Sequence, residues 1–126
     1  MPVIRIAALP QPALADVQPL LARLCLALAE IDRAEPRHWW AVWQTIAPGS
    51  YTEGGVSAPA TQPSASHPPL VDIQAFTGRQ TAVIERLLDA TAAILADGLG
   101  IEPGNVFVTW TELEPGRVFT GGEIRR

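Results

Sequence analysis

An internal duplication is the feature that most constrains how this 126-residue chain can fold. The apolar run at residues 2–9 is similar to the run at residues 69–76, which is a shift of 67 positions from Pro2 to Pro69. The same shift, without a gap, relates Leu20-Leu21 to Leu87-Leu88, Glu35-Pro36 to Glu102-Pro103, Trp43 to Trp110, and Gly54-Gly55 to Gly121-Gly122. Because a repeat at a fixed period indicates a repeated structural unit, the sequence predicts two copies of one unit, at residues 2–55 and 69–122.

Each copy contains a short apolar run, a longer amphipathic segment and a second apolar run. The short runs have the length and apolar content of strands, and the longer segments place apolar residues at helical spacing. We therefore expect strands at residues 2–9, 38–46, 69–76 and 105–113, and helices at residues 14–31 and 80–99. A strand, a helix and a strand in about 55 residues form a β-α-β unit with parallel strands and a right-handed crossover.

Two such units joined edge to edge predict a single α+β domain over residues 1–126, with a four-stranded mixed sheet and both helices on one face. The other face would carry apolar residues that one chain cannot bury, so we expect self-association. Residues 56–68 lack periodicity and charge and are rich in Pro, Ser and Ala. We interpret them as an extended linker between the copies, with His67 exposed to solvent.

The composition excludes several classes of function. The formal net charge is −4, and the chain shows no basic cluster, so we expect no nucleic-acid partner. No apolar run approaches the ~20 residues of a membrane span and no signal peptide opens the chain, which predicts a cytoplasmic protein that does not contact a membrane. The single Cys25 cannot form an internal disulfide, and we expect neither a metal ion nor an organic cofactor.

Four short motifs, taken in their order, resemble the tautomerase superfamily. They are Met1-Pro2 before an apolar run, Gly78-Arg79 after the first strand of the second copy, the strand from Val106 to Glu112 with its Thr-Glu ending, and Gly121-Gly122-Glu123. Simple members of that family, such as 4-oxalocrotonate tautomerase, are single β-α-β units. The length of this chain is similar to that of the fused members, which include cis-3-chloroacrylic acid dehalogenase and malonate semialdehyde decarboxylase.

The resemblance implies a tautomerase fold of the MIF-like type, assembled as a homotrimer. It also implies that Met1 is removed and that Pro2 then carries a free secondary amine. In an apolar pocket near cationic Arg side chains the pKa of such an amine falls, so that the neutral amine can act as a general base near physiological pH. The implied activity is that of a keto–enol tautomerase or isomerase acting on a small-molecule carboxylate substrate.

The functional residues of the family carry over to a few positions of this chain. Pro2 matches the catalytic proline, whereas the nitrogen of Pro69, its counterpart in the second copy, lies in a peptide bond. Arg79 matches the arginine that holds the substrate carboxylate by bidentate hydrogen bonds. Tyr51 falls where the simple tautomerases have an aromatic residue in the pocket. The resemblance therefore implies a catalytic role for Pro2 and substrate-binding roles for Arg79 and Tyr51.

Four further candidates occupy positions at which this chain departs from the family. Trp40 and Phe107 stand where the simple tautomerases carry an arginine early in the second strand, which makes the pocket more apolar and disfavours dicarboxylate substrates. His38 occupies the region in which the decarboxylase has an aspartate. Arg117, which replaces Ser50 of the first copy, is a candidate for binding anions. We include all four among the candidate substrate-binding residues.

Two classes of function stay open. The first is an isomerase that uses Pro2 as a general base. The alternative is a non-catalytic or repurposed trimeric scaffold that binds a small molecule, or a hydratase, dehalogenase or decarboxylase of the same superfamily. Retention of Met1 would place the nitrogen of Pro2 in an amide and would favour the alternative, because an amide nitrogen is not a base.

Overall fold

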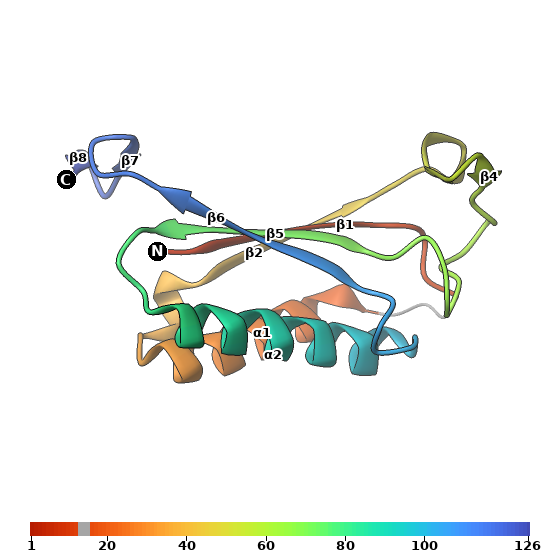
Figure 1. Ribbon diagram of the computed structural model, residues 1–126, viewed down its shortest axis with the longest axis horizontal. Helices are drawn as coiled ribbons and strands as arrows, with labels where there is room; N and C mark the ends of the chain where they lie inside the picture. The colour runs from red at the N-terminus through yellow and green to blue at the C-terminus, as the bar shows by residue number, and fades with distance from the viewer. Residues whose placement is uncertain (13–15) are drawn as a thin grey trace.

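The computed structural model describes residues 1–12 and 16–126, and over these residues the chain forms two layers (Figure 1). One layer is a four-stranded mixed sheet, formed by β1 (Val3–Ala8), β2 (Trp40–Thr45), β5 (Leu70–Phe76) and β6 (Phe107–Leu113). The other layer consists of α1 (Val17–Asp32) and α2 (Thr81–Leu99), which cover one face of the sheet. The α+β fold predicted from the duplication is therefore confirmed. Of the helix expected at residues 14–31, residues 14 and 15 lie outside the described residues.

The duplication is visible in how the strands pair. β1 runs parallel to β2 with Val3 opposite Trp40, and β5 runs parallel to β6 with Leu70 opposite Phe107, which is the same register 67 positions later. β1 and β5 are antiparallel neighbours at the centre of the sheet, whose order is β2-β1-β5-β6. Each end of the sheet therefore brings together the strand starts of one copy and the strand ends of the other.

The core lies between the sheet and the helices. Each helix turns a stripe of buried side chains, spaced by about one turn, towards the sheet. The buried residues that form this core include Ile4, Ile6, Leu20, Leu24, Leu28, Val71, Ile73, Leu87 and Leu95. Both helices end at a residue in the left-handed conformation, Arg33 and Gly100, again 67 positions apart. In the part of the chain that the structure describes, neither helix combines the length and the apolar content that crossing a bilayer would require.

A two-stranded hairpin follows the sheet in each copy. β3 (Thr52–Glu53) pairs with β4 (Val56–Ser57) at one end of the molecule, and β7 (Val118–Thr120) pairs with β8 (Glu123–Arg125) at the other end (Figure 1). The amino terminus lies at the same end as β7 and β8. Short 3-10 helices at Pro36–His38 and Pro48–Ser50 lead into β2 and towards β3.

Residues 56–68, which the sequence predicts to be an extended linker, contain buried side chains. The first two residues of this segment form β4, and the side chains of Gln62 and His67 are buried. The Nε2 atom of His67 lies 2.9 Å from the carbonyl oxygen of Val56, and the backbone N–H of His67 donates to the carboxylate of Glu53. The prediction that His67 is exposed is therefore wrong, because the segment folds back and forms its own hydrogen-bonded structure.

The sheet face opposite the helices is left uncovered by the described part of the chain. Large apolar side chains are exposed there, among them Val42, Leu70 and Phe107, and these three line a hollow of about 530 Å³. A contiguous apolar surface of this kind is typical of an interface. The exposed face agrees with the expectation that one copy of the chain cannot bury all of its apolar residues.

Candidate active site

A pocket lies at the end of the sheet where the chain begins. Because β1 starts where antiparallel β5 ends, Met1 lies close to Phe76, and the parallel partner β2 adds Trp40. The β7–β8 hairpin contributes another wall. The pocket has a volume of about 410 Å³ and is lined by Met1, His38, Trp40, Phe76, Thr120, Gly121 and Arg125.

Pro2 follows Met1, which lines the pocket, and is fully buried. Its carbonyl oxygen accepts a hydrogen bond of 3.0 Å from the backbone N–H of Trp40, which fixes the start of β1 against β2. The amine belongs to Met1 in this structure, and burial lowers its pKa below the ordinary value. The positive charge of Arg79 lowers this pKa further, the negative charge of Asp32 raises it, and Arg125 again lowers it. The surroundings of the chain start therefore favour a neutral amine.

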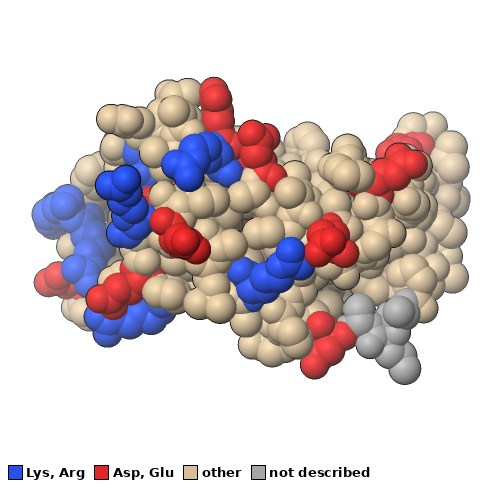
Figure 2. Space-filling model, turned by 90° about the horizontal axis from the view of Figure 1, so that it is seen from below, with Lys and Arg blue, Asp and Glu red and all other residues tan. Residues whose placement is uncertain are grey.

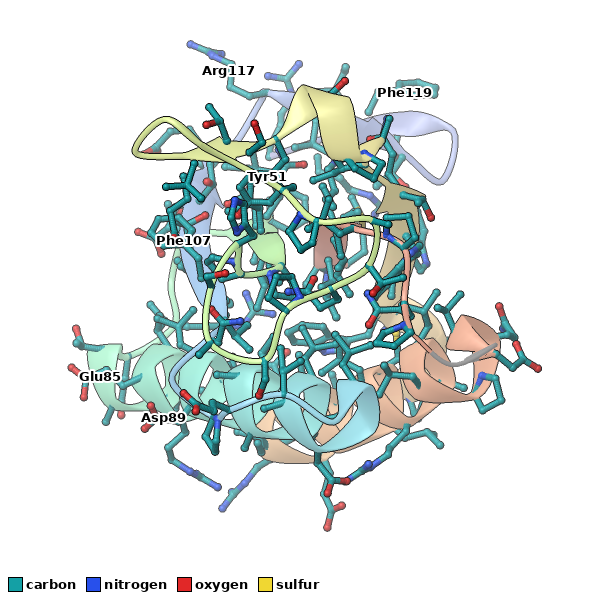
Figure 3. The ribbon with its side chains drawn as sticks, turned by 90° about the vertical axis from the view of Figure 1, so that its right-hand side faces the viewer. Tyr51, Glu85, Asp89, Phe107, Arg117 and Phe119 are labelled. Carbon is teal, nitrogen blue, oxygen red and sulfur yellow. The ribbon has the colours of Figure 1, made fainter. Side chains whose placement is uncertain are left out.

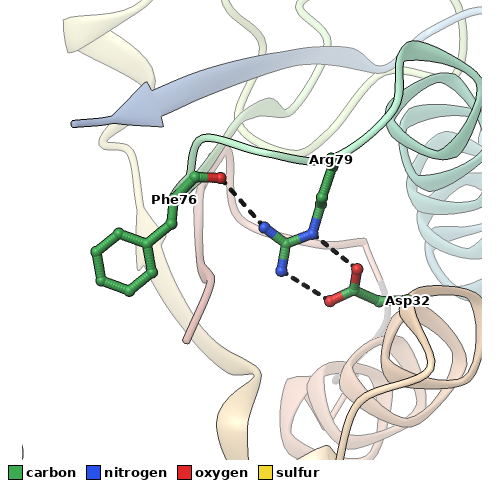
Figure 4. A network of polar contacts seen from close by, with 3 residues as sticks. All are labelled: Asp32, Phe76 and Arg79. Atoms are coloured by element: carbon green, nitrogen blue, oxygen red, sulfur yellow. Dashed lines mark hydrogen bonds and ion pairs between the residues drawn. The ribbon is translucent and has the colours of Figure 1, made fainter. Parts of the chain in front are cut away.

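Arg79 is held firmly at the same end of the molecule (Figure 4). Its Nε and Nη2 atoms donate to the two carboxylate oxygens of Asp32, over 2.7 and 2.8 Å, and Nη1 donates to the carbonyl oxygen of Phe76 over 3.3 Å. The guanidinium also lies 5.7 Å from the ring centre of Trp110, within cation–π range. The bidentate edge that the resemblance assigns to a substrate carboxylate is therefore occupied by a carboxylate of the chain itself.

The structure brings together some of the expected site residues and separates others. His38 and Trp40 line the pocket with Met1. Phe107 instead lines the hollow on the open sheet face, and Tyr51 lies below the β3–β4 hairpin at the opposite end, where its hydroxyl donates to the carbonyl oxygen of Pro68 over 2.6 Å (Figure 3). Arg117 is exposed, its side chain points outward (Figure 3), and it is not among the residues that line the pocket.

Basic side chains are unevenly distributed over the helix side of the molecule. In a view from the helix side, basic side chains gather towards the left, while acidic side chains occur along the whole length (Figure 2). Within the described residues, no group of three or more His, Cys, Asp or Glu side chains is placed to hold a metal ion. The arrangement thus favours an anionic ligand with an apolar part, because Trp40 and Phe76 line the pocket beside Arg125.

Comparison with known proteins gives the fold. No family model matches the chain, and no curated protein sequence matches it. Among solved structures, Pt0534 inactivated by 2-oxo-3-pentynoate superimposes with a TM-score of 0.84 at 16% identity, covering 98% of this chain and 94% of that chain. A fused 4-OT described as a symmetric trimer gives a TM-score of 0.83 at 17% identity, with coverages of 98% and 94%.

The chain has the fold of fused 4-OT. A structure of N1, a member of the cis-3-chloroacrylic acid dehalogenase family, also matches, with a TM-score of 0.74 at 20% identity over 98% of this chain and 83% of that chain. Because each of these structures covers 98% of this chain, the similarity spans both copies and the segment between them. It supports the predicted fused arrangement of two β-α-β units.

Within this fused 4-OT fold, the sequence reasoning missed three residues at the pocket end. Asp32, the last residue of α1, is nearly buried and holds Arg79. Phe76 and Arg125 line the pocket, one at the end of β5 and the other in β8. The antiparallel pairing of β1 with β5 is the signal that could have placed Phe76, because it sets the end of β5 beside the start of β1.

Proposed function

We propose that this chain is a member of the tautomerase superfamily, and that it is an isomerase in which Pro2 acts as a general base after removal of Met1. The observation that carries the proposal is the pocket at the chain start, where burial and Arg79 together lower the pKa of the Met1 amine, the neighbour of the amine that Pro2 would carry after removal of Met1. A neutral amine is the form that can accept a proton, so these surroundings suit a base. The fold shared with fused 4-OT supports the same assignment.

The proposed reaction interconverts an enol and a keto acid. The amine of Pro2 removes the proton of the enol hydroxyl, the C–O bond becomes a carbonyl, and the electron pair of the C=C bond takes a proton at carbon from the resulting ammonium. Atoms and charge balance without a further reactant. Trp40 and Phe76 provide apolar walls, and the positive charges of Arg79 and Arg125 attract the carboxylate of the substrate.

A homotrimer is part of the proposal. The uncovered sheet face exposes Val42, Leu70 and Phe107, which need a partner surface in water. The similar fused 4-OT structure is described as a symmetric trimer. Sedimentation equilibrium at micromolar concentration is the direct measurement, and a monomer would contradict this part of the proposal.

The central experiment combines mass spectrometry with covalent labelling. Intact mass of the protein expressed from its own start codon should show loss of Met1. Treatment with 2-oxo-3-pentynoate, the compound that inactivates the similar Pt0534, should then modify Pro2. Because only the neutral amine reacts, the rate should rise with pH and reach half its maximum below the ordinary pKa of a terminal amine. Full retention of Met1, or modification elsewhere, would exclude the base assigned here.

A non-catalytic binding scaffold is the second candidate. It is favoured by the bidentate contact between Asp32 and Arg79, which uses the edge of the guanidinium expected to hold a substrate. A scaffold of this kind would bind a small carboxylate without labelling at Pro2 and without turnover of any enol acid. The labelling experiment therefore separates the two candidates.

A further inference from the structure

Arg125 is the arginine among the residues that line the pocket at the chain start. It lies in β8, and its backbone carbonyl oxygen accepts a hydrogen bond of 2.6 Å from the backbone N–H of Gly116. This bond and the pairing with β7 fix the backbone of Arg125 beside the pocket. Arg79, to which the resemblance assigns the substrate carboxylate, is not among the residues that line the pocket. The pocket therefore carries a different arginine from the one that the resemblance indicates.

Most N–H groups of the Arg125 guanidinium have no acceptor within the described part of the chain. Nη1 donates to a carboxylate oxygen of Glu123 over 3.0 Å, and the two side chains of this pair are 45% and 67% exposed. Exposed pairs of this kind compete weakly with a ligand. Among the described residues, Nε and Nη2 donate to no protein atom, and these two nitrogens form one bidentate edge of the guanidinium. Arg79 uses the same edge to hold the carboxylate of Asp32, which shows the kind of group that this edge of Arg125 can bind.

Gly121 lies against the guanidinium of Arg125. The turn between β7 and β8 places Gly121 and Gly122 in the left-handed region, with φ angles of 63° and 85°. A Cβ atom on Gly121 would overlap the Nη2 atom of Arg125, whereas a Cβ atom on Gly122 would meet no atom of the described residues within 4 Å. Gly121 also lines the pocket. The absence of a side chain at Gly121 therefore leaves the space in which the guanidinium lies.

The hairpin of the first copy lacks this contact. The shift of 67 positions relates Arg125 to Ala58 and Gly121 to Gly54. Gly54 has a similar φ of 54°, but a Cβ atom there would meet no described atom within 4 Å. The turn alone thus does not produce the contact, which belongs to the hairpin that borders the pocket.

We propose that Arg125 binds the carboxylate of the substrate in this pocket, and that Gly121 is a positioning residue that leaves room for the guanidinium. The inference rests on the proposed function and deepens it, because it names the residues through which that site recognises a carboxylate. The edge formed by Nε and Nη2 matches the two oxygens of one carboxylate. The apolar part of the ligand lies beside Trp40 and Phe76.

The first test uses the unaltered protein with propionate as the probe. Nuclear magnetic resonance of the arginine Nε–H groups reports which guanidinium meets the anion. Propionate should shift the resonance of Arg125 in a saturable way and shift that of Arg126 much less. Arg126 is the matched comparison, because it follows Arg125 in the chain and lines a neighbouring hollow but not the pocket. A titration in which Arg125 does not shift, or shifts no more than Arg126, would overturn the proposal.

The second test fills the space beside the guanidinium. Gly121→Ala should weaken propionate binding about tenfold, because a displaced guanidinium loses at least one charge-assisted hydrogen bond to the anion. Gly122→Ala is the matched control: it adds the same methyl group at a left-handed position of the same turn, away from Arg125, and should change the affinity less than about twofold. Equal weakening in the two variants would assign the effect to backbone strain and contradict the role of Gly121.

A further variant keeps this test valid if Gly121→Ala does not fold. Gly121→Asn also adds a Cβ atom against Arg125, and asparagine tolerates the left-handed conformation in a two-residue hairpin turn. It should weaken propionate binding by a similar factor while circular dichroism shows a folded protein. Unchanged affinity in a folded Gly121→Asn variant would contradict the positioning role.

Labelling at Pro2 separates this inference from the proposed function. In Gly121→Ala, the concentration of 2-oxo-3-pentynoate that gives half the maximal labelling rate should rise about tenfold, whereas the rate at saturation should stay within about twofold. A lower rate at saturation with an unchanged half-saturating concentration would contradict a role in carboxylate binding. If the compound labels Pro2 in no variant, the base is wrong, while the propionate measurements still decide the roles of Arg125 and Gly121.

Discussion

The two ends of the sheet are built from the same elements and differ in what occupies them. At the end with the pocket, called the open end, Pro2 precedes β1, and its carbonyl oxygen accepts a hydrogen bond from the backbone N–H of Trp40. At the opposite end, called the closed end, Pro69 precedes β5, and its carbonyl oxygen accepts a hydrogen bond from the backbone N–H of Phe107. Both prolines are fully buried. At the open end, the residue before Pro2 is Met1, which lines a pocket. At the closed end, the residue before Pro69 is Pro68, the last residue of the segment at residues 58–68.

Hydrogen bonds hold that segment in place at the closed end. Asn105, which corresponds to His38 of the open end, donates from its side chain to the carbonyl oxygens of Pro63 and Ser66. Tyr51 donates to the carbonyl oxygen of Pro68. The same position thus holds a residue that lines the pocket in the first copy, His38, and a residue that binds the segment at residues 58–68 in the second copy, Asn105. Duplication supplied two equivalent ends, and the connection between the copies occupies one of them.

The largest expected effect tests whether only the open end is reactive. Pro2→Ala, with Met1 removed, should lower kcat for an enol acid such as phenylenolpyruvate by about a hundredfold or more, the range for loss of a positioned base. Pro69→Ala at the closed end should lower kcat less than about threefold, because its nitrogen lies in a peptide bond. Steady-state kinetics with circular dichroism as a folding control provides the measurement. Equal losses in both variants would remove the functional difference between the ends.

The next effect concerns the stability of the charged contact found at the open end alone. Arg79→Ala leaves the nearly buried carboxylate of Asp32 without its partner, and should lower the free energy of unfolding by about 3 kcal/mol, the low end for a broken buried pair because Arg79 keeps some exposure. Pro12→Ala, the equivalent change at the closed end, should cost less than about 1 kcal/mol. Urea denaturation measures both, and similar values would show that the contact adds little.

A smaller effect distinguishes two arginines near the β7–β8 hairpin. Arg125→Ala should raise KM for a monocarboxylate substrate about ten- to a hundredfold, corresponding to a charge-assisted hydrogen bond of about 1.5–3 kcal/mol. Arg117→Ala should change KM less than about twofold, because Arg117 is exposed and does not line the pocket. The reverse order of effects would favour the role in anion binding that the sequence suggested for Arg117.

Most of the fold could be predicted from the sequence because each copy of the duplication tests the elements expected in the other. Each element expected in one copy had a counterpart 67 positions away, and the strand registers repeat with that shift. The segment at residues 58–68 could not be predicted in this way, since it has no counterpart. The side chains of its buried Gln62 and His67 form hydrogen bonds with the backbone carbonyl oxygens of His67 and Val56, and no repeated pattern in the sequence indicates these contacts.

The candidate site was predictable only in part. Pro2, His38 and Trp40 meet because they lie at the starts of adjacent parallel strands, which a sequence pattern can indicate. The contact between Asp32 and Arg79 joins residues 47 positions apart in different copies, and nothing in the local pattern of either residue indicates it. The resemblance matched Tyr51 to a pocket position, but Tyr51 lies at the closed end of the sheet, whereas the pocket beside Met1 lies at the open end.

The smallest expected effect tests what keeps the closed end closed. Tyr51→Phe removes only the hydroxyl that donates to the carbonyl oxygen of Pro68, and should lower the free energy of unfolding by about 1 kcal/mol. Amide exchange should quicken at Ala58, whose N–H donates to the carbonyl oxygen of Tyr51, and should stay unchanged in β1. Thr52→Val is the matched control, because it removes an exposed hydrogen bond to Val56 in the same hairpin and should cost less than about 0.5 kcal/mol. If Tyr51→Phe leaves both stability and exchange unchanged, the hydroxyl does not hold the segment, and packing of the Tyr51 ring against His67, at 5.3 Å between ring centres, closes this end instead.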